Sequence, residues 1–519
     1  MSKNYLIGIG GTGARVIEAM VFMCAAGYGP DELSIFLVDP DKGNGNFRRT
    51  KELIETYTYC RRNYQRIDNG GLFKTDIKIP DPIVWNIFED ERENQDTTLA
   101  AYINFGGLQR DKADFASVLF SNDELETPLN KGFRGHPSIG SVVMSNIDES
   151  KYPWKLLFDD MPTAGQNEIK LFLVGSIFGG TGAAGVPTFG SKDIIKYHKE
   201  ADLGSNKSKV LLGSALILPY FSFASDVDTD EKMFVTPKDF PMATKAALDY
   251  YGTKKEELGF DQIYFVGDSG GQNVGNFSAG SDTQENLPHF IEIVSGLTAY
   301  DFFEQEPVAD IPIKQYFVGG RPEDAVTWNN LPFGREFDDN SGKKMQRDKK
   351  FKSDVVTMSV FTYAMCTHVC RDDKKGVLDT ENDSLPWFAN NFPKAARTDD
   401  NKKMVIKFCE FSKLFLAWIC AIGQNERVKL IDKNKIVDGN ILVGQDIKVF
   451  DDNKNGGLHE RFIGDIVAGG GSKESKPFST LISRLNDINL KKANVSPVSK
   501  VISAVYQSAR RFSEENYKL

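Results

Sequence analysis

The stretch that decides the fold is residues 5–39, YLIGIGGTGARVIEAMVFMCAAGYGPDELSIFLVD. It opens with an apolar run and turns through glycines at positions 8, 10, 11 and 13. Apolar residues then recur three or four apart, which is the spacing of one helix face. A second apolar run, IFLV, ends at Asp39. Strand, glycine turn, helix and strand in this order predict a βαβ unit at the start of the chain.

A second strand, glycine turn and helix follow further along the chain. Residues 169–177 (IKLFLVGSI) form a continuous apolar run, as a parallel strand buried on both faces requires, and FGGTGAAG follows at 178–185. Two more apolar runs, at 210–218 and 262–266, predict further buried strands. Strands that alternate with helices over about 270 residues predict an α/β fold with a doubly wound, Rossmann-like parallel sheet.

The alternation of strand and helix stops in the second half of the chain. A helical segment is predicted from about 286 to 304, and the rest mixes helices and strands without a repeated βα rhythm. We therefore divide the chain into a first domain at 1–285, a central helix at 286–304 and a C-terminal α+β domain at 305–519.

Composition and charge exclude two classes of protein. The 519 residues hold 63 Lys and Arg against 72 Asp and Glu, a net charge of −9. Duplex nucleic acids are bound by basic surfaces, so we expect no nucleic acid partner. The strongest apolar stretch, 413–423, is too short to span a bilayer and has charged residues just upstream. It predicts a buried helix, and we expect no membrane span.

The cysteines and the start of the chain indicate a reduced, cytoplasmic protein. Six cysteines, at 24, 60, 366, 370, 409 and 420, are too few and too scattered for a disulfide scaffold, and the strand-like run from Tyr5 begins too early for a signal peptide. Cys366, His368 and Cys370 resemble a zinc-binding motif. On a helix, however, the two cysteines share a face while His368 points elsewhere, so we predict packing cysteines and no metal ligands.

Both glycine turns have the chemistry of a phosphate site. A glycine-rich turn between a buried strand and a helix exposes backbone N–H groups and the positive end of the helix dipole. The first turn also fits the dinucleotide fingerprint GxGxxG, and Asp39 stands where such a fold places its ribose-binding acid. Taken alone, this turn indicates an NAD- or FAD-dependent oxidoreductase, or a turn that serves only close packing.

The second glycine turn favours a polyphosphate bound from two sides, because a dinucleotide-binding fold does not need a second phosphate-binding turn. No GxxxxGK[ST] segment occurs, so the sequence excludes a P-loop NTPase. The candidate phosphate-binding residues are Gly10, Gly11, Thr12, Gly13, Gly179, Gly180, Thr181 and Gly182.

At these residues the chain resembles the tubulin and FtsZ superfamily, closest to its divergent prokaryotic tubulin-like members. IGIGGTGARV resembles the first phosphate loop, and FGGTGAAG resembles the signature loop GGGTG[ST]G with Phe178, Ala183 and Ala184 departing from it. LILPYF at 216–221, IYFVGD at 263–268 and IVSGL at 293–297 resemble later elements, and GHPSIG at 135–140 falls near another γ-phosphate loop.

The resemblance implies GTP or GDP with Mg²⁺, bound by residues 1–285 at the carboxyl ends of the strands. It also implies head-to-tail filaments in which the next subunit's loop completes the GTPase site. That loop carries NxDxxD in the family, and the equivalent positions here are Val308, Asp310 and Ile313. Asp310 is therefore the candidate catalytic residue, and because its partners are apolar, a weak or absent GTPase activity stays open.

Three further residues are candidates for base and ribose contacts. Asn286 has donor and acceptor groups suited to a guanine edge. Asp268 stands where the family often has Asn, and Asp39 fits a position near the phosphates or ribose. Each of them also suits an ordinary cap or loop position.

The leading hypothesis is thus a self-assembling, cytoplasmic GTP-binding protein of prokaryotic tubulin type, with partner proteins encoded in the same operon. Its setting would be a conflict or segregation system. Two alternatives stay open, namely the NAD- or FAD-dependent oxidoreductase and a tubulin-like scaffold that binds nucleotide without hydrolysing it. The sequence leaves the choice between guanine and adenine open.

Overall fold

The computed structural model describes most of the chain. The described residues are 2–41, 43–67, 71–81, 83–86, 97–129, 132–133, 135–148, 150–151, 153–161, 168–191, 210–224, 238–268, 272–276, 286–305, 314–319, 325–332, 336–338, 344–371, 374–436, 462–468 and 474–517.

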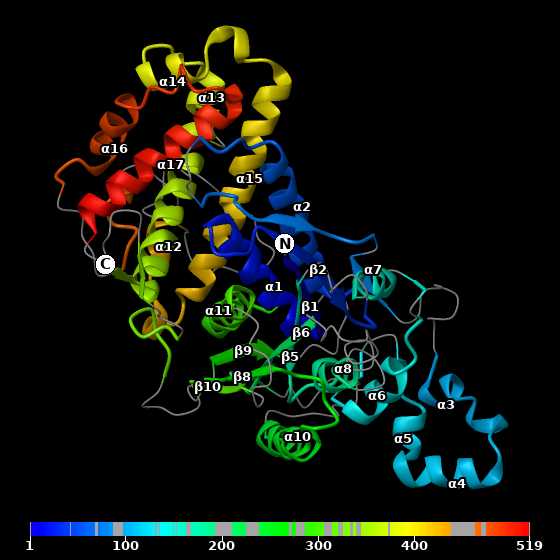
Figure 1. The fold of residues 1–519 in the computed structure, drawn as a ribbon. Coiled ribbons are helices and arrows are strands. Elements are labelled where there is room, and N and C mark those ends of the chain that lie inside the picture. Colours follow the sequence, from blue (N-terminus) through cyan, green and yellow to red (C-terminus); the bar gives the residue numbers. More distant parts are fainter. Residues whose placement is uncertain are drawn as a thin grey trace.

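One parallel sheet forms the centre of the molecule (Figure 1). Its strand order is β10-β8-β6-β5-β1-β2-β3, with the short β4 also paired to β2, and every pairing is parallel. Central strands buried on both faces need uninterrupted apolar runs, which is why the sequence predicted them. The strands are β1 (Ser2–Ile9), β2 (Glu32–Val38), β3 (Asp76–Lys78), β4 (Val84–Trp85), β5 (Glu168–Ser176), β6 (Val210–Ile217), β8 (Gln262–Val266) and β10 (Lys314–Val318).

Helices cover both faces of this sheet. Side chains of β1 alternate between two cores, since Leu6 packs on one side while Tyr5 and Ile7 pack on the other. The Leu6 side holds α1 (Gly10–Ala25), α2 (Gly45–Arg62) and α11 (Phe290–Glu304). The opposite side holds α6 (Pro137–Met144), α7 (Trp154–Asp160), α8 (Thr181–Phe189) and α10 (Phe240–Lys254). The predicted α/β class with a doubly wound, Rossmann-like sheet is confirmed.

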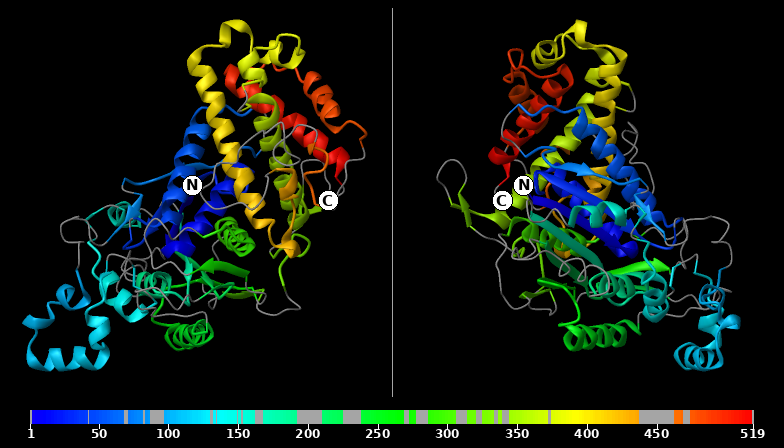
Figure 2. Two further views of the ribbon diagram at one scale, coloured as in Figure 1. Left: turned by 180° about the vertical axis from the view of Figure 1, so that it is seen from behind. Right: turned by 45° about the vertical axis from the view of Figure 1, so that its right-hand side comes forward.

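A small helical arm leaves the body after β4. It comprises α3 (Leu99–Tyr102), η1 (Phe105–Gly107), α4 (Arg110–Leu119) and α5 (Asn122–Leu125), and Figures 1 and 2 show it projecting from the rest. Its base is closed by backbone hydrogen bonds from Leu99 to Thr127 and from Leu129 to Thr97. Phe115, Val118 and Leu119 of α4 are exposed. Outside the arm, β7 (Phe221–Ala224) pairs with β9 (Gln272–Asn276) in a short two-stranded parallel sheet.

The region predicted as α+β is mainly helical. Its strand β10 extends the central sheet, and β11 (Glu336–Asp338) pairs with β12 (Lys344–Gln346). The apolar stretch at 413–423 ends a long helix, α15, and none of the described helices is long and apolar enough to cross a membrane. The helical elements are α12 (Arg347–Ala364), η5 (Met365–Val369), α13 (Val377–Thr380), α14 (Pro386–Asn391), η6 (Lys394–Ala396), α15 (Asp399–Ile422), η7 (Glu426–Val428), η8 (Lys433–Lys435), α16 (Pro477–Asn486) and α17 (Pro497–Asn516).

These C-terminal helices share one core with α1 and α2. The ring of Phe22 in α1 lies 5.6 Å from that of Phe415 and 4.7 Å from that of Trp418, both in α15. Aromatic pairs at such distances bury large apolar areas. The helix predicted over 286–304 begins at Phe290, four residues late, and ends at Glu304. The division of the chain into domains at 285 and 304 stays a prediction.

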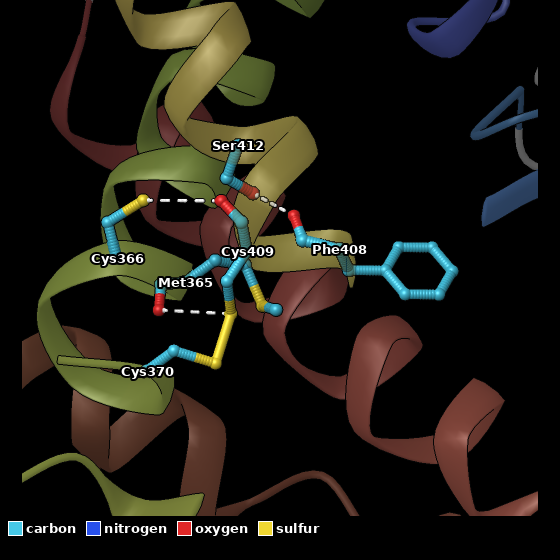
Figure 3. The surroundings of a disulfide bond; sticks show 6 residues. All are labelled: Met365, Cys366, Cys370, Phe408, Cys409 and Ser412. Carbon is cyan, nitrogen blue, oxygen red and sulfur yellow. Dashed lines mark hydrogen bonds between the residues drawn. A yellow bond between two sulfur atoms is a disulfide. The ribbon is translucent and has the colours of Figure 1, made fainter. Parts of the chain in front are cut away.

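The expectation that the cysteines are reduced is wrong for two of the six. The structure joins Cys370 and Cys409 in a disulfide, although 39 positions separate them in the sequence (Figure 3). The π-helical turn η5 at the end of α12 lies against α15 and brings the two thiols together, which sequence spacing alone does not reveal. The other four cysteines are buried and belong to no disulfide. His368 packs between the rings of Trp387 and Phe478, and the described residues hold no group of three His, Cys, Asp or Glu that could bind a metal ion.

Candidate functional site

Both glycine turns lie where the strand order reverses. From the central pair β1 and β5, the chain adds β2 and β3 on one side and β6, β8 and β10 on the other. In open α/β sheets, ligands bind outside the carboxyl ends of the strands at this switch point. The turn at residues 10–13 follows β1 and the turn at 179–182 follows β5, so the fold places both at one location (Figure 1).

The two turns are in contact. Gly10 has a φ of +75°, a backbone conformation that favours glycine, and a Cβ added to it would lie 3.3 Å from the backbone nitrogen of Gly182 and 3.3 Å from Cβ of Thr181. A Cβ on Gly182 would lie 2.6 Å from the carbonyl oxygen of Ser176. A side chain at position 10 would therefore fill the space between the two turns, and a side chain at position 182 would clash with the end of β5.

Two helix N-termini point their free N–H groups into this region. Neither α1 nor α8 has a side-chain hydrogen bond at its N-cap, and neither has an acidic residue in its first turn. The first backbone N–H groups of a helix lack partners within it, and the helix dipole adds partial positive charge there. Uncapped ends whose first turns hold no acidic residue fit a phosphate group, and two such ends fit a polyphosphate.

A third segment reaches the second turn. A Cβ on Gly180 would lie 2.9 Å from the backbone nitrogen of Gly135 and 3.2 Å from the side chain of Phe133. Gly132 has a φ of +81°, and a Cβ added to it would lie 3.9 Å from the hydroxyl oxygen of Thr181. The stretch 135–140, which the sequence comparison sets near a γ-phosphate loop, is only partly a loop, because α6 begins at Pro137. The segment near 135 therefore borders the candidate phosphate site.

Asp39 lies at the carboxyl end of β2, as predicted, but its carboxyl group is buried. It accepts a hydrogen bond from the backbone N–H of Asp41 at 2.8 Å. Burial raises the pKa of Asp39 well above its usual range and outweighs that hydrogen bond, which lowers it. Asp39 thus has a local role in the loop after β2, and nothing in its contacts assigns it to a ribose.

Asp268 is paired with a residue of the C-terminal helices. It follows β8 and accepts a hydrogen bond from the guanidinium of Arg427 in η7, and its side chain is buried while that of Arg427 is one-third exposed. The pair joins the edge of the sheet to the segment after α15. The predicted base contact of Asp268 stays a prediction.

Asn286 belongs to a polar network beside the first turn. Its side-chain Oδ1 accepts from Nη1 of Arg15 at 3.1 Å and from Nδ2 of Asn46 at 3.3 Å. The amide of Asn46 also lies next to Gly11, since a Cβ on Gly11 would be 3.3 Å from Nδ2 of Asn46. The predicted base-contacting residue and the predicted phosphate loop are therefore neighbours through Asn46.

Arg15 is the centre of this network. Its guanidinium is buried, with Nε 2.5 Å from Oε1 of Glu292, and Nη2 donates to the phenol oxygen of Tyr220 at 2.5 Å and to Oγ1 of Thr12 at 3.4 Å. Burial alone would lower the pKa of Arg15, but the neighbouring Tyr220 and Glu292 raise it above its usual range, so the guanidinium stays charged. A charged pair thus links the first turn to α11.

Sequence reasoning missed these partners. A signal was present, because Arg15 and Glu18 are charged residues inside an otherwise apolar helical stretch. Charged side chains are almost never fully buried unless they are paired. Glu18 is buried as well and pairs with Arg49 of α2 at 2.7 Å. Their partners lie in distant segments, which the sequence could not identify.

The catalytic and metal predictions are not tested by this geometry. Asp310, the predicted catalytic residue, lies outside the described residues, as do positions 306–313 around it. Mg²⁺ in nucleotide sites is held through substrate phosphates with one or two carboxylates. The side chains beside the turns include the hydroxyls of Thr12 and Thr181 and the amide of Asn46, which fit phosphate oxygens and waters.

The chain has a distant structural likeness to a known protein. No protein-family model matches the chain, and no curated protein matches it. A similar solved structure is that of CetZ2 from Haloferax volcanii, described as a GTPgS-bound protofilament. The two share 16% identity over 57% of this chain and 58% of that chain, with a TM-score of 0.26. This chain therefore spans less than two thirds of that one, and a likeness of this size carries no conclusion about function.

Proposed function

We propose that this chain is a tubulin/FtsZ-like protein that binds a guanine nucleotide and self-assembles head to tail. The observation that carries the proposal is the contact between the two glycine turns, where a Cβ on Gly10 would lie 3.3 Å from the backbone nitrogen of Gly182. Two uncapped helix N-termini meeting at the switch point of a parallel sheet suit a polyphosphate better than a single phosphate.

In this proposal the protein acts by positioning and by neutralising charge. The N–H groups at the start of α1, at Gly10 to Gly13, and of α8, near Thr181 and Gly182, bind the phosphate oxygens. Mg²⁺, when bound, neutralises phosphate charge. Asn286 contacts the base, and Asp310 from a neighbouring subunit orients the attacking water.

GTP hydrolysis is a separate part of the proposal from GTP binding. Only Asp310 remains of the acidic pattern in the loop that follows the central helix, so we propose a weak GTPase. A scaffold that binds GTP or GDP without turnover is the corresponding alternative. Filament polarity would follow from a heterologous contact between copies. We propose a prokaryotic conflict or segregation system as its setting, with further proteins from the same operon as partners.

The oxidoreductase alternative has one supporting observation. Asp39 ends the strand beside β1, where a dinucleotide fold places its ribose acid. Its carboxyl group is nevertheless buried and bonded to its own loop. The contact between the two glycine turns has no explanation in that alternative beyond packing.

The identity of the bound nucleotide tests the proposal. We would denature freshly purified protein and identify any released compound by chromatography and mass spectrometry, then measure the binding of added GTP, ATP and NAD. Release of GDP or GTP, or tight binding of added GTP, is the expected result. Release of NAD or FAD would replace the proposal with the oxidoreductase, and a protein that neither releases nor binds any nucleotide would refute both.

Self-assembly is tested separately. We expect GTP to increase light scattering above a threshold protein concentration, and electron microscopy to show filaments. Phosphate release above the same threshold would identify a GTPase, whereas filaments without phosphate release would identify the scaffold. A monomer at all concentrations with bound GTP would disprove the assembly part alone.

A further inference from the structure

The helical arm presents apolar side chains to solvent on α4 (Figure 1). Phe115, Val118 and Leu119 are 64%, 83% and 54% exposed. Their spacing of three and four places them on one face of the helix, while Ala116 between them is buried. Apolar residues scattered singly over a surface are ordinary, but a contiguous group on a projecting helix indicates an interaction surface. We call these three residues the α4 face.

The arm is ordered at its base, so the body sets the position of the α4 face. Leu125 and Leu129 of the arm are buried in the same core as Ile139 of α6. The two ends of the arm also pair with each other in an antiparallel bridge between Thr98 and Pro128. A surface that is ordered before it binds loses less conformational entropy on binding.

Both ends of the arm lie at the carboxyl edge of the sheet. Trp85 of β4, the strand before the arm, pairs with Val38 at the end of β2. In α5, Oε1 of Glu124 lies 3.0 Å from Nδ1 of His136, and the preceding residue, Gly135, borders the second glycine turn. The arm therefore stands beside the edge of the sheet through which the proposed head-to-tail contact passes.

Size and charge favour a second copy of this chain as the partner. Three side chains are too few for a stable complex of their own, which buries about 800 Å² on each side. The α4 face therefore suits a place within a larger contact, and a head-to-tail interface supplies one. The exposed charges of α4 are balanced, since Arg110 and Lys112 offset Asp111 and Asp114. A second copy, which also carries a net charge of −9, thus meets no net charge on this helix.

We propose that the α4 face binds the next copy in the same filament, so that the arm clasps the head-to-tail contact from its side. This inference rests on the proposed self-assembly and names a surface that serves it. The contact is heterologous, because the arm of each copy meets the body of its neighbour. Contacts of this kind repeat along an open filament.

The first experiment weakens the α4 face and leaves the helix intact. Phe115→Gln with Val118→Gln replaces two exposed side chains by a good helix former. Sedimentation should show that the protein concentration needed for GTP-dependent assembly rises at least about tenfold, because each new contact in the filament loses apolar burial. The affinity of the unassembled protein for GTP should stay at the wild-type value.

The matched control is Met242→Gln with Ile406→Gln. It also removes two exposed apolar side chains, one from α10 and one from α15, and both lie outside the arm. The control should assemble at the wild-type concentration. Equal assembly of all three proteins, or an equal loss in both variants, would overturn the inference and leave the proposed function standing.

Cross-linking tests the neighbour directly. The four cysteines outside the disulfide are buried, so a thiol-reactive benzophenone should label Val118→Cys selectively in the folded protein. Irradiation of filaments should join α4 of one copy to the body of the next, and mass spectrometry of the peptides identifies both sites. Links between two α4 helices would show a symmetric contact, and assembled filaments without links would show none. Either result overturns the inference.

A lipid surface is the alternative occupant that the experiments must distinguish. If wild-type protein sediments with phosphatidylcholine vesicles and Phe115→Gln with Val118→Gln does not, the α4 face binds lipid and the inference is overturned. Protein that binds GTP but stays monomeric would refute the inference together with the assembly part of the proposed function. Failure to bind any nucleotide would refute the proposed function, and the inference with it.

Discussion

The Nζ atom of Lys170 lies 2.8 Å from the carbonyl oxygen of Phe303 and is buried. Lys170 stands at the amino end of β5, and Phe303 is in the last turn of α11. The same Nζ donates to the carbonyl of Gln305 at 2.5 Å. A buried ammonium thus binds the free carbonyl groups at the end of this helix, where a positive charge also favours the helix dipole.

Lys170→Met should therefore destabilise the protein by about 2 kcal/mol, because two carbonyl groups lose a charged donor. Urea unfolding at neutral pH measures this. Lys254→Met is the control, since Lys254 pairs with Glu257 on the exposed surface of α10 and its loss should change the stability much less than the loss of Lys170. Equal effects of the two substitutions would contradict the role of Lys170.

Gly10→Ala should weaken nucleotide binding at least about tenfold. The new Cβ would occupy the space between the two turns, and the φ of +75° would be strained, at a cost of about 1 kcal/mol. Nucleotide content after purification and the affinity for added GTP are the readouts. Gly106→Ala is the control, because no atom lies within 4 Å of a Cβ there. Full nucleotide content in Gly10→Ala would refute the placement of the phosphates.

Acid should destabilise the protein through two buried histidines. Burial lowers the pKa of His289 and of His368 from 6.5 to about 4. The unfolded chain therefore binds more protons between pH 6.5 and 4, so the free energy of unfolding falls as the pH falls through this window, by about 1.4 kcal/mol per pH unit for each histidine.

The test compares the pH dependence of wild type and variant. His289→Asn keeps an N-cap acceptor for α11, and His368→Phe keeps a ring beside Trp387. The double variant should lose less stability than the wild type between pH 6.5 and about 4. Parallel curves for the two proteins would show that these histidines do not carry the acid dependence.

Reduction of the disulfide should lower the stability by about 2–4 kcal/mol, because the bond closes a long loop in the unfolded chain. The free thiols of the denatured, unreduced protein should number four, matching the four free cysteines. Cys370→Ala with Cys409→Ala should make the stability insensitive to reductant, whereas Cys24→Ala should leave that sensitivity in place. Six free thiols in unreduced protein would disprove the bond.

The sequence predicted the sheet well because parallel central strands need apolar residues on both faces. The runs at 169–177 and 210–218 are uninterrupted, and the structure places β5 and β6 there. The contact between the two turns was inferred only from their shared chemistry. Sequence cannot predict how closely Gly10 approaches Gly182, since that approach depends on the pairing of β1 with β5.

The polar network was not predictable for a related reason. Glu18 lies three positions after Arg15 on the same helix but pairs with Arg49, and the acceptors Tyr220 and Glu292 of Arg15 lie far along the chain. Likewise, Cys370 and Cys409 meet only because η5 packs against α15. Long-range pairs between polar residues depend on tertiary packing, whereas apolar periodicity is read locally.

The ion pair of Arg15 with Glu292 also sets an order of events during synthesis. The two residues are 277 positions apart. At 5–20 residues per second, the ribosome needs roughly 15–60 s to make Glu292 after Arg15. Over that interval the emerging α1 carries a charge whose partner has not been translated, so its native burial must wait for α11. Release of a nucleotide-competent chain therefore depends on more than half of the protein having left the ribosome.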